Sequence, residues 1–423
     1  MTDEFSLLDK VNNGEIKPTG AKPKLPLKLD GLDSENLNVY RIPLDMLYYN
    51  DANGRIRAAR AQFEDVARSS DDGDVYNAIV ERLVEDSDSA KLKKTKKDIQ
   101  EKGQLIFGYV LDDGRVIDGN RRFTALRQLQ RETDQQQYFE AVILPVTFKD
   151  KADRELIKRL ELALQMGIEN KVDYDAVDAA VDVWQTVEID QIMLLGDYAK
   201  NAGKTVKSVE ESLNVVYLMQ DFLNHINANK QNFQLIKDLQ IYNALAEIGK
   251  NLKKRYPKAG PEMEDSKQLA FTQLHSLIYT GGDRVRDMRT YFAGVVDSTS
   301  YGDFKDEVDD YVEELQDAFD DKQVASAADY RATLEELTPQ FRQIQKVKND
   351  TVNSTKRSKD AAEFIESLRQ INKTLADLKA GHGLTGKLRW NQFDSTEIRT
   401  IRDYMVKIGN DSVSLVDIYN DEL

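Results

Sequence analysis

The sequence predicts an α+β protein in which a small α/β domain precedes two helical regions. Residues 103–131 read as strand, tight turn, strand, loop and helix, a pattern typical of an α/β unit. No proline occurs between Pro145 and Pro257, where apolar residues recur at helical spacing. The predicted domains are a flexible N-terminal arm at residues 1–36, an α/β domain at residues 37–150, a helical domain with a candidate helix-turn-helix at residues 151–255, and an acidic all-helical C-terminal region at residues 256–423.

The composition excludes several classes of protein and site. With 423 residues, 40% hydrophobic and 31% charged, the chain has the composition of a soluble globular protein. It lacks an apolar run long enough to span a membrane and a secretory signal at its start, so we expect a cytoplasmic protein. The absence of cysteine excludes disulfides, thiolate zinc sites and a thiol nucleophile, and a metal site would therefore use oxygen ligands.

The charge is distributed unevenly along the chain. A net charge of −15 argues against a protein that coats nucleic acid through bulk electrostatics, although one local basic face would still allow DNA binding. The lysine run at residues 91–97 and the arginines at residues 115–131 would supply such a face. The alternative is that these lysines form a solvated helix face.

Turn residues and proline mark the elements of the α/β domain. Asp113 and Gly114 separate two short apolar runs, which indicates a β-hairpin. Pro145 lies inside the last apolar run and indicates an edge strand or a bulge. The predicted strands are residues 37–43, 106–111, 115–117 and 139–148, and the predicted helices between the first strand and the hairpin are residues 56–68, 75–84 and 92–102.

The chemistry is concentrated where the hairpin ends and a helix begins. Gly119 allows the backbone to approach a ligand closely, and the first N–H groups of the following helix have no partner within the helix. Arg121 and Arg122 lie in the first turn, so a di- or triphosphate would meet amide donors and two guanidinium groups in one place. The alternative is that Asn120 only caps the helix and the arginines face solvent.

This segment resembles the phosphate-binding box of the ParB/sulfiredoxin-like superfamily, which in ParB proteins reads G-E-R-R with an alanine shortly after it. Gly119, Arg121, Arg122 and Ala125 match that box, whereas Asn120 replaces the glutamate. The resemblance covers residues 37–225 and implies that the α/β domain is a ParB/sulfiredoxin-like nucleotide-binding domain.

Two further boxes of the family are matched less completely. Asn50 and Arg55 fall at the asparagine and arginine of the first box, without its two prolines, and the resemblance implies that both line the nucleotide pocket. Glu169 and Asn170 correspond to the Glu-Asn pair of the third box and would hold Mg²⁺ with the nucleotide. That pair is displaced by about two residues from the family spacing, and a plain turn between helices is the alternative.

The helical domain contains a candidate helix-turn-helix. Helices are predicted at residues 176–187, 189–201 and 206–224, with a glycine-containing turn before the last. The resemblance implies that Lys204, Lys207 and Ser208 open a DNA-recognition helix. The alternative is a helical hairpin that serves only for packing.

Amphipathic helices are predicted throughout the C-terminal region. Residues 304–319 form an apolar stripe backed by acidic residues, which is either a solvated face or a site for a basic partner. Between residues 361 and 378 apolar side chains alternate spacings of three and four, which predicts either burial in a helical bundle or self-association as a coiled coil. Residues 390–405 suggest a packed terminal helix.

The resemblance implies a ParB-like DNA-binding protein of a bacterium, plasmid or phage, regulated by CTP or another NTP with Mg²⁺ and involved in partition or regulation. In this interpretation Arg121 and Arg122 neutralise the phosphates, the protein is a homodimer, and slow NTP hydrolysis resets it. One alternative is a nuclease or phosphotransferase on the same fold, with Asp118 or Glu169 as catalytic base or metal ligand. The other is a defence or regulatory interaction protein with a vestigial pocket.

Overall fold

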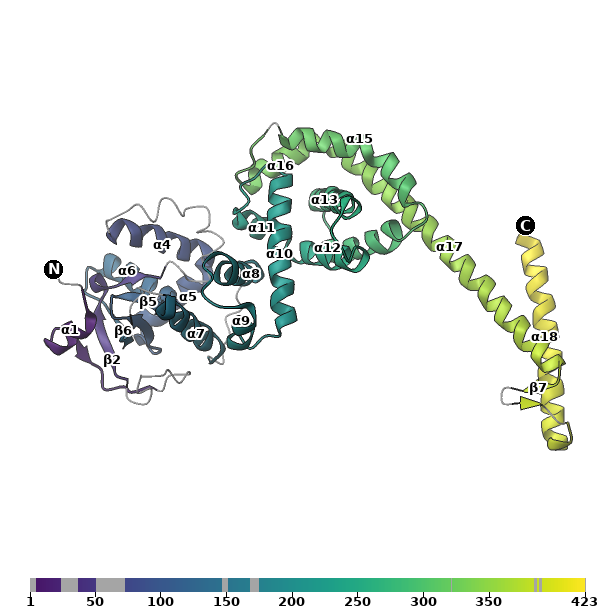
Figure 1. Ribbon diagram of the computed structural model, residues 1–423, viewed down its shortest axis with the longest axis horizontal. Coiled ribbons are helices and arrows are strands. Elements are labelled where there is room, and N and C mark those ends of the chain that lie inside the picture. Colours follow the sequence, from purple (N-terminus) through teal and green to yellow (C-terminus); the bar gives the residue numbers. More distant parts are fainter. Residues whose placement is uncertain are drawn as a thin grey trace. The chain divides into compact units, whose positions relative to one another are not determined.

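The computed structural model describes residues 5–23, 37–50, 73–146, 151–167, 175–320, 322–383, 386–387 and 390–422. The chain forms two compact units, Met1–Thr351 and Val352–Leu423, and Figure 1 traces the elements of each. A small mixed sheet is followed by helices, which confirms the predicted α+β class. The predicted boundaries near residues 150 and 255 fall inside the first unit and remain predictions.

The six-stranded sheet has the order β1-β2-β6-β4-β5-β3. Its strands are β1 Lys17–Pro18, β2 Val39–Pro43, β3 Tyr48–Tyr49, β4 Gly108–Leu111, β5 Arg115–Asp118 and β6 Tyr138–Leu144. Strands β4 and β5 form the predicted antiparallel hairpin, with Gly114 at a φ of 91° in the turn. Strand β3 pairs with β5 in parallel, and β4 pairs with β6 in parallel. Two parallel pairs therefore surround the segment that leads to the candidate site.

Residues 5–23, which we expected to belong to a flexible arm, instead form part of the folded unit. Helix α1, Leu7–Asn12, is followed by β1, which pairs with β2. Leu7 is completely buried, and the Leu8 N–H donates a 2.8 Å hydrogen bond to the Asp112 carboxylate. This attachment of α1 could not be predicted from the sequence, because its partner Asp112 lies about a hundred residues further along the chain.

Helices cover both faces of the sheet. One face packs against α4, Gly73–Ser87, α5, Ser89–Lys102, and α6, Asn120–Thr133. The other packs against α7, Lys151–Gly167, through Ile157, Leu160 and Leu164. Neighbouring residues of β4 divide between these faces, because Val110 belongs to the first core and Leu111 to the second. The end of β5 is thereby held between two packed layers.

The rest of the first unit is a helical bundle, in which other helices surround α13 (Figure 1). Many side chains of α13 are buried. Its elements are α8 Ala176–Trp184, η2 Gln185–Ile189, α9 Leu195–Asn201, α10 Val206–His225, α11 Phe233–Leu239, α12 Tyr242–Arg255, α13 Pro261–Thr280, α14 Arg284–Tyr291, η3 Phe292–Val296, α15 Tyr301–Asp320, α16 Ala327–Glu336 and the start of α17, Thr338–Lys379. The helix predicted from residue 189 begins only at Leu195, because Gln191 adopts a φ of 47° that ends the preceding π-helical turn.

The second unit has no buried core among its described side chains. It comprises the rest of α17, the short strands β7, His382–Gly383, and β8, Gly386–Lys387, the turn η4, Trp390–Gln392, and α18, Ser395–Glu422. No described side chain between residues 352 and 420 is buried, so the predictions of a bundle-buried seam and of a packed terminal helix are both wrong. The β7–β8 hairpin also departs from the all-helical expectation. Within the described part of the chain, no helix is both long and apolar enough to cross a bilayer.

Candidate anion site at the start of α6

A glycine in the left-handed region connects β5 to α6. Gly119 has a φ of 102° and occupies the N-cap position, where it has no side chain with which to cap the helix. A Cβ atom on Gly119 would lie 2.8 Å from Cζ of Phe139 and 2.9 Å from Nη2 of Arg122. Only glycine fits this position without displacing its neighbours. Because glycine has no side chain, the N-cap residue itself does not compete with an anion for the first N–H groups of α6.

Arg122 folds back over Gly119 toward the end of β5. Its Nη2 donates a 2.7 Å hydrogen bond to Oδ2 of Asp118, four residues earlier. Its Nε is buried and has no hydrogen-bond partner among the described residues. Asp118, one of the predicted catalytic candidates, therefore already contacts a cation from the first turn of α6. An anion bound here would share the Arg122 guanidinium with Asp118. Asp118 would act as a base only after its hydrogen bond with Arg122 was broken.

Arg121 lies where two helices begin. Burial raises the pKa of Asp88, the N-cap of α5, but the hydrogen bond and charge of Lys91 together with the charge of Arg121 hold it below its usual value. Further along the two helices, Lys96 of α5 forms a 2.7 Å ion pair with Glu132 of α6. The charge interaction between Asp88 and Arg121 joins the starts of α5 and α6, and the Lys96–Glu132 pair joins later turns of the two helices. The helices α5 and α6 therefore run in the same direction. Two positive helix ends therefore lie near Arg121.

Two asparagines belong to the same edge of the sheet. Tyr49 pairs with Val116 in the parallel register, so Asn50 follows β3 on the side where β5 ends at Asp118. Asn50 and Asn120 are 1% and 6% exposed, respectively, and Oδ1 of Asn120 has no hydrogen-bond partner in the described part of the chain. The structure thus brings Asn50 to the sheet edge that carries the Gly119–Arg122 segment. It also shows that Gly119, and not Asn120, is the N-cap.

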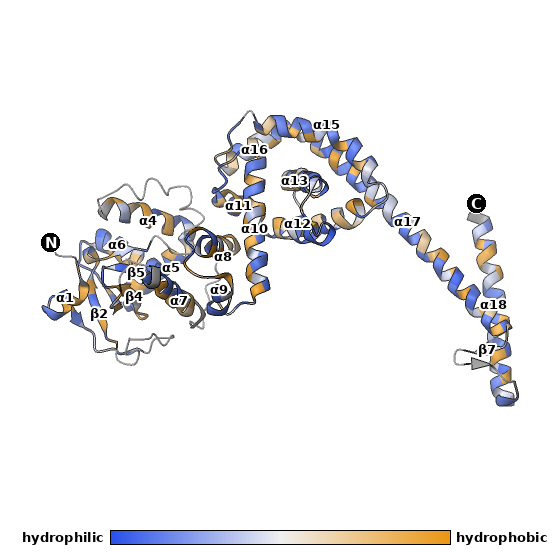
Figure 2. Cartoon of the chain, in the orientation of Figure 1, coloured by the Kyte–Doolittle hydropathy of each residue, from blue (hydrophilic) through white to orange (hydrophobic). Residues whose placement is uncertain are grey.

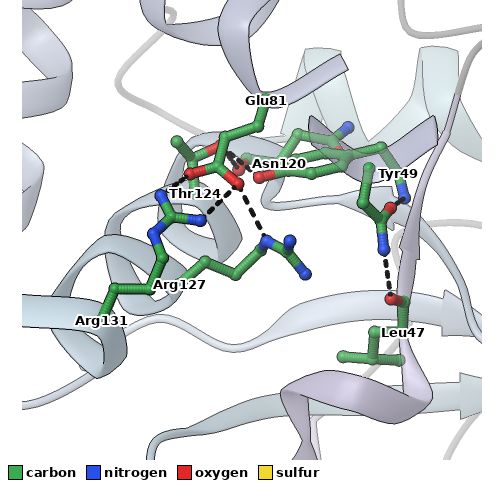
Figure 3. Close-up of polar contacts among 8 residues, drawn as sticks. Leu47, Tyr49, Glu81, Asn120, Thr124, Arg127 and Arg131 are labelled. Carbon is green, nitrogen blue, oxygen red and sulfur yellow. Dashed lines mark hydrogen bonds and ion pairs between the residues drawn. The ribbon is translucent and has the colours of Figure 1, made fainter. Parts of the chain in front are cut away.

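A series of hydrogen bonds holds this edge of the sheet against α4 and the first turn of α6 (Figure 3). The Tyr49 hydroxyl and Oγ1 of Thr124 are 2.9 Å apart, and Thr124 donates a 2.9 Å bond to the Asn120 carbonyl. Asn77 of α4 donates to the Leu47 carbonyl at 3.2 Å and accepts from the Tyr49 N–H at 3.1 Å. These contacts join β3, α4 and the first turn of α6, and nothing in the sequence pairs them because the partners are distant in the chain.

A buried carboxylate engages two of the arginines that we had assigned to a basic face. Glu81 of α4 accepts a 3.0 Å bond from Nε of Arg127 and a 3.1 Å bond from Nη1 of Arg131 (Figure 3). Burial opposes the ionised form of Glu81, but the hydrogen bonds from Arg131 and Arg127 hold its pKa below the usual value. These two arginines therefore support α6 from inside the domain, which reduces the basic surface that is available to a ligand.

Some predicted site residues lie outside the described part of the chain. Arg55, Glu169 and Asn170 belong to segments that the structure does not describe. Among the described residues, no group of three or more histidine, aspartate or glutamate side chains is arranged to hold a metal ion. The Mg²⁺ ligands expected at Glu169 and Asn170 therefore remain a prediction.

The predicted DNA-binding residues lie together at the start of α10. Gly203, at a φ of 60°, forms the turn after α9, and the Thr205 hydroxyl caps α10 by accepting the Ser208 N–H at 3.1 Å. Lys204, Lys207 and Ser208 are exposed. Val209, Leu213 and Val216 are buried on the opposite face of the helix. The two lysines thus flank an exposed helix start that is fixed by its own buried face.

A buried ionic cluster connects α7 to these helices. Lys158 of α7 is 3% exposed and donates to Asp182 of α8 at 2.7 Å and to Glu161 at 3.2 Å. The Tyr198 hydroxyl of α9 donates to the other Asp182 oxygen at 2.7 Å. Because α7 also covers the sheet, this cluster ties the first helix of the predicted helix-turn-helix to the α/β domain. The sequence shows only isolated charges within apolar helices here, so this ionic cluster could not be predicted from it.

Comparisons with known proteins show no matching protein family and no matching curated protein. Among solved structures, the chain is similar to the C-terminally truncated chromosome-partitioning protein ParB from Caulobacter crescentus complexed to the centromeric parS site, with 12% identity over 59% of this chain and 95% of that chain and a TM-score of 0.30. It is also similar to that truncated ParB complexed with CTP-gamma-S, with 13% identity over 55% of this chain and 98% of that chain and a TM-score of 0.17. Similarity at this level carries no argument about function, for which we rely on the chain's own residues.

Proposed function

We propose that this protein is a ParB-like, nucleotide-regulated DNA-binding protein. It binds the phosphates of CTP or another NTP at the start of α6 and DNA at the start of α10. One observation carries the proposal most directly, namely the uncapped start of α6 behind a Gly119 that admits no side chain. Amide N–H groups and the positive end of a helix form a ready anion site, to which Arg121 and Arg122 add charge.

The nucleotide would complete interactions that the described residues leave open. Nε of Arg122 is buried without a partner in the described part of the chain, and a phosphate oxygen is an acceptor that suits it. Arg122 would then contact both the phosphate and Asp118. Asn50 and Arg55 would line the pocket, and Glu169 and Asn170 would hold Mg²⁺ with the phosphates. These four assignments rest on the family resemblance.

Regulation would be transmitted through α7. This helix packs on the face of the sheet opposite α6 and contributes Lys158 to the cluster with Asp182 and Tyr198. A shift of the sheet on nucleotide binding would therefore reach α9 and the exposed lysines at the start of α10. Lys204 and Lys207 would contact DNA phosphates, and Ser208 would lie beside them.

An enzyme on this fold is the alternative, with Asp118 as the catalytic base. The contact between Asp118 and Arg122 disfavours this function, because Oδ2 of Asp118 already accepts a hydrogen bond from the Arg122 guanidinium. Slow NTP hydrolysis is compatible with the regulatory function. Fast turnover in the absence of DNA, lost in Asp118→Asn, would favour the enzyme.

Calorimetric titration of CTP, ATP and GTP with Mg²⁺ into the full chain tests the proposal. We expect one nucleotide to bind, and Arg121→Ala to weaken its binding at least tenfold, because a charge-assisted hydrogen bond contributes roughly 1.5–3 kcal/mol. Arg369→Ala is the matched control, since Arg369 of α17 forms an exposed ion pair with Glu366. Binding that Arg121→Ala leaves unchanged would remove the α6 site. Absence of binding by all three nucleotides would favour an interaction protein with a vestigial pocket.

A further inference from the structure

Each of the four arginines of α6 lies near a carboxylate. The pairs are Arg121 with Asp88, Arg122 with Asp118, and both Arg127 and Arg131 with Glu81. The Glu81 side chain is only 7% exposed, whereas those of Asp88 and Asp118 are 26% and 29% exposed. A dissolved anion can therefore compete with Asp88 and Asp118 for their arginines, but not with Glu81.

The sheet holds Asp118 in reach of Arg122. Asp118 is the last residue of β5 and pairs with Tyr109 of β4 in the antiparallel register. Nη2 of Arg122 donates to Oδ2 of Asp118 at 2.7 Å. Burial and then the charge of Asp118 raise the pKa of Tyr109 to about 12, whereas the charge of Arg122 lowers it, so this hydroxyl lies near both partners. Because strand pairing fixes the backbone of Asp118, its carboxylate remains beside the anion site.

The start of α5 holds Asp88 in a similar way. Its Oδ1 accepts the Lys91 N–H at 3.0 Å, and its Oδ2 lies 2.9 Å from Nζ of Lys91. Burial raises the pKa of Asp88, but Lys91 and then Arg121 hold it below its usual value, so Arg121 lies within electrostatic range of this carboxylate. Hydrophilic residues predominate along α5 (Figure 2), and the Lys91 side chain is 54% exposed. Dissolved anions therefore reach the start of this helix.

The two carboxylates offset most of the positive charge at the two helix starts. Lys91, Arg121 and Arg122 are cations, and Asp88 and Asp118 leave only one positive charge in excess among these five side chains. A phosphate that binds either arginine must share the guanidinium with a carboxylate that is already in place. The attraction is then weaker, because the phosphate and the carboxylate repel each other.

We infer that Asp88 and Asp118 are internal competitors of the phosphate groups and set the affinity of the α6 site. Asp118 competes for Arg122, and Asp88 competes for Arg121 and Lys91. The inference rests on the proposed function, because it requires a nucleotide whose phosphates bind these arginines. The competition makes the affinity lower than the three cations alone would give. A nucleotide that regulates the protein can therefore dissociate and be exchanged.

Calorimetric titration of the full chain and its Asp88→Asn and Asp118→Asn variants tests the inference. The ligands are CTP, ATP, GTP and inorganic tripolyphosphate, each with Mg²⁺. Asparagine removes the charge while keeping an N-cap residue at position 88 and a hydrogen-bond acceptor at position 118. We expect each variant to lower the Kd about fivefold, because a charge-assisted hydrogen bond is roughly twice as strong as a neutral one. The double variant should lower it more than tenfold, and tripolyphosphate should show the same gain without a base.

Matched controls separate this competition from a general change of charge. Asp98→Asn on α5 and Glu132→Gln on α6 alter the net charge equally, and both carboxylates form exposed ion pairs with lysines. They lie ~15 Å further along their helices than Asp88 and Arg122, which exceeds the screening length of about 10 Å at 0.1 M salt. Both controls should leave the Kd unchanged. In an Arg122→Ala background, Asp118→Asn should no longer raise the affinity, because the group for which it competes is gone.

The outcomes distinguish failure of the inference from failure of the proposed function. Nucleotide binding by the wild type that both variants leave unchanged would overturn the inference alone. Weaker binding in either variant would do the same, because the carboxylate would then orient its arginine for the phosphate. A gain from Asp118→Asn that persists with Arg122→Ala would show direct repulsion of the phosphate instead of competition. If neither the wild type nor the double variant bound any nucleotide or tripolyphosphate, the proposed function and the inference would both be wrong.

Discussion

Lys158 and Asp182 form a 2.7 Å ion pair in which each side chain is less than a tenth exposed. Breaking a buried pair leaves an uncompensated charge, which typically costs about 3–5 kcal/mol. We therefore expect Lys158→Met to lower the free energy of unfolding by about that amount. Urea unfolding of the full chain measures the loss.

A double variant distinguishes the stability cost of an unpaired buried charge from the cost of lost packing. Lys158→Met with Asp182→Asn removes both charges of this pair, keeps an acceptor for the Tyr198 hydroxyl and leaves only the Glu161 carboxylate without its cation. It should recover part of the lost stability. Lys97→Met on exposed α5 is the control, and it should change stability by less than about 0.5 kcal/mol. A Lys158→Met variant as stable as this control would contradict the interpretation.

Gly119→Ala tests the backbone requirement at the anion site. A Cβ atom there would contact the ring of Phe139 and the Arg122 guanidinium, and φ is positive as well. We expect a loss of about 1–3 kcal/mol from strain alone, together with weaker nucleotide binding. Gly196→Ala in α9 is the control, because its Cβ would meet no atom within 4 Å. An equal effect of the two substitutions on unfolding would show that Gly119 is not constrained.

The stability of the helical bundle should fall on mild acidification. His225 and His275 stack with ring centroids 5.2 Å apart, and His275 Nδ1 lies 2.5 Å from the Tyr330 hydroxyl. Burial lowers the pKa of His225 to about 4 and that of His275 well below its usual value. In the unfolded chain both histidines bind protons near pH 6.5. The unfolded state therefore binds more protons between about pH 6.5 and 4, and stability decreases as the pH falls through this window.

Urea midpoints at pH 7 and pH 5 measure this dependence. His225→Phe removes one titrating group while keeping an aromatic ring beside Phe271, with which His225 makes a ring contact. We expect a smaller decrease between the two pH values in this variant. His382→Phe alters the remaining histidine of the chain and serves as the control. An equal decrease in wild type and His225→Phe would assign the pH dependence to carboxylates.

Charge reversal at the start of α10 should weaken DNA binding. Lys204→Glu and Lys207→Glu each remove one cation that we place against DNA phosphates. For each lost phosphate contact, the slope of log K against log salt should decrease by about 1. Fluorescence anisotropy with duplex DNA at several salt concentrations measures the slope. Lys250→Glu, on the exposed side of α12, should leave it unchanged. A salt slope that is identical in all three variants would assign Lys204 and Lys207 to solvent.

Local signals in the sequence predicted the elements that surround the site. The Asp113–Gly114 pair located the β4–β5 hairpin, and the change from strand to helical spacing after Asp118 located the start of α6. These features depend on neighbouring residues, so a sequence pattern carries them. The same is true of the turn before α10, where Gly203 and Thr205 define the helix start.

Long-range partners could not be predicted in this way. The ion pairs of Glu81 with Arg127 and Arg131 join residues about fifty positions apart, and no periodicity marks them. The pairing of β3 with β5 and the attachment of α1 join residues that lie still further apart in the chain. The heptad at residues 361–378 was visible, but which surface covers it depends on other chains or elements that a single stripe does not specify.

Asn77 gives the sheet a protected border. Among the described strands, β3 lies at one end of the sheet, where backbone groups of neighbouring residues would otherwise be open to another molecule. The Asn77 amide occupies the Leu47 carbonyl and the Tyr49 N–H as a further strand would. A foreign strand that docked at this position would have to displace α4 first. We therefore expect resistance to edge-to-edge aggregation at this border to depend on side chains of α4, the Asn77 amide and the Tyr76 hydroxyl that donates to the Tyr49 carbonyl.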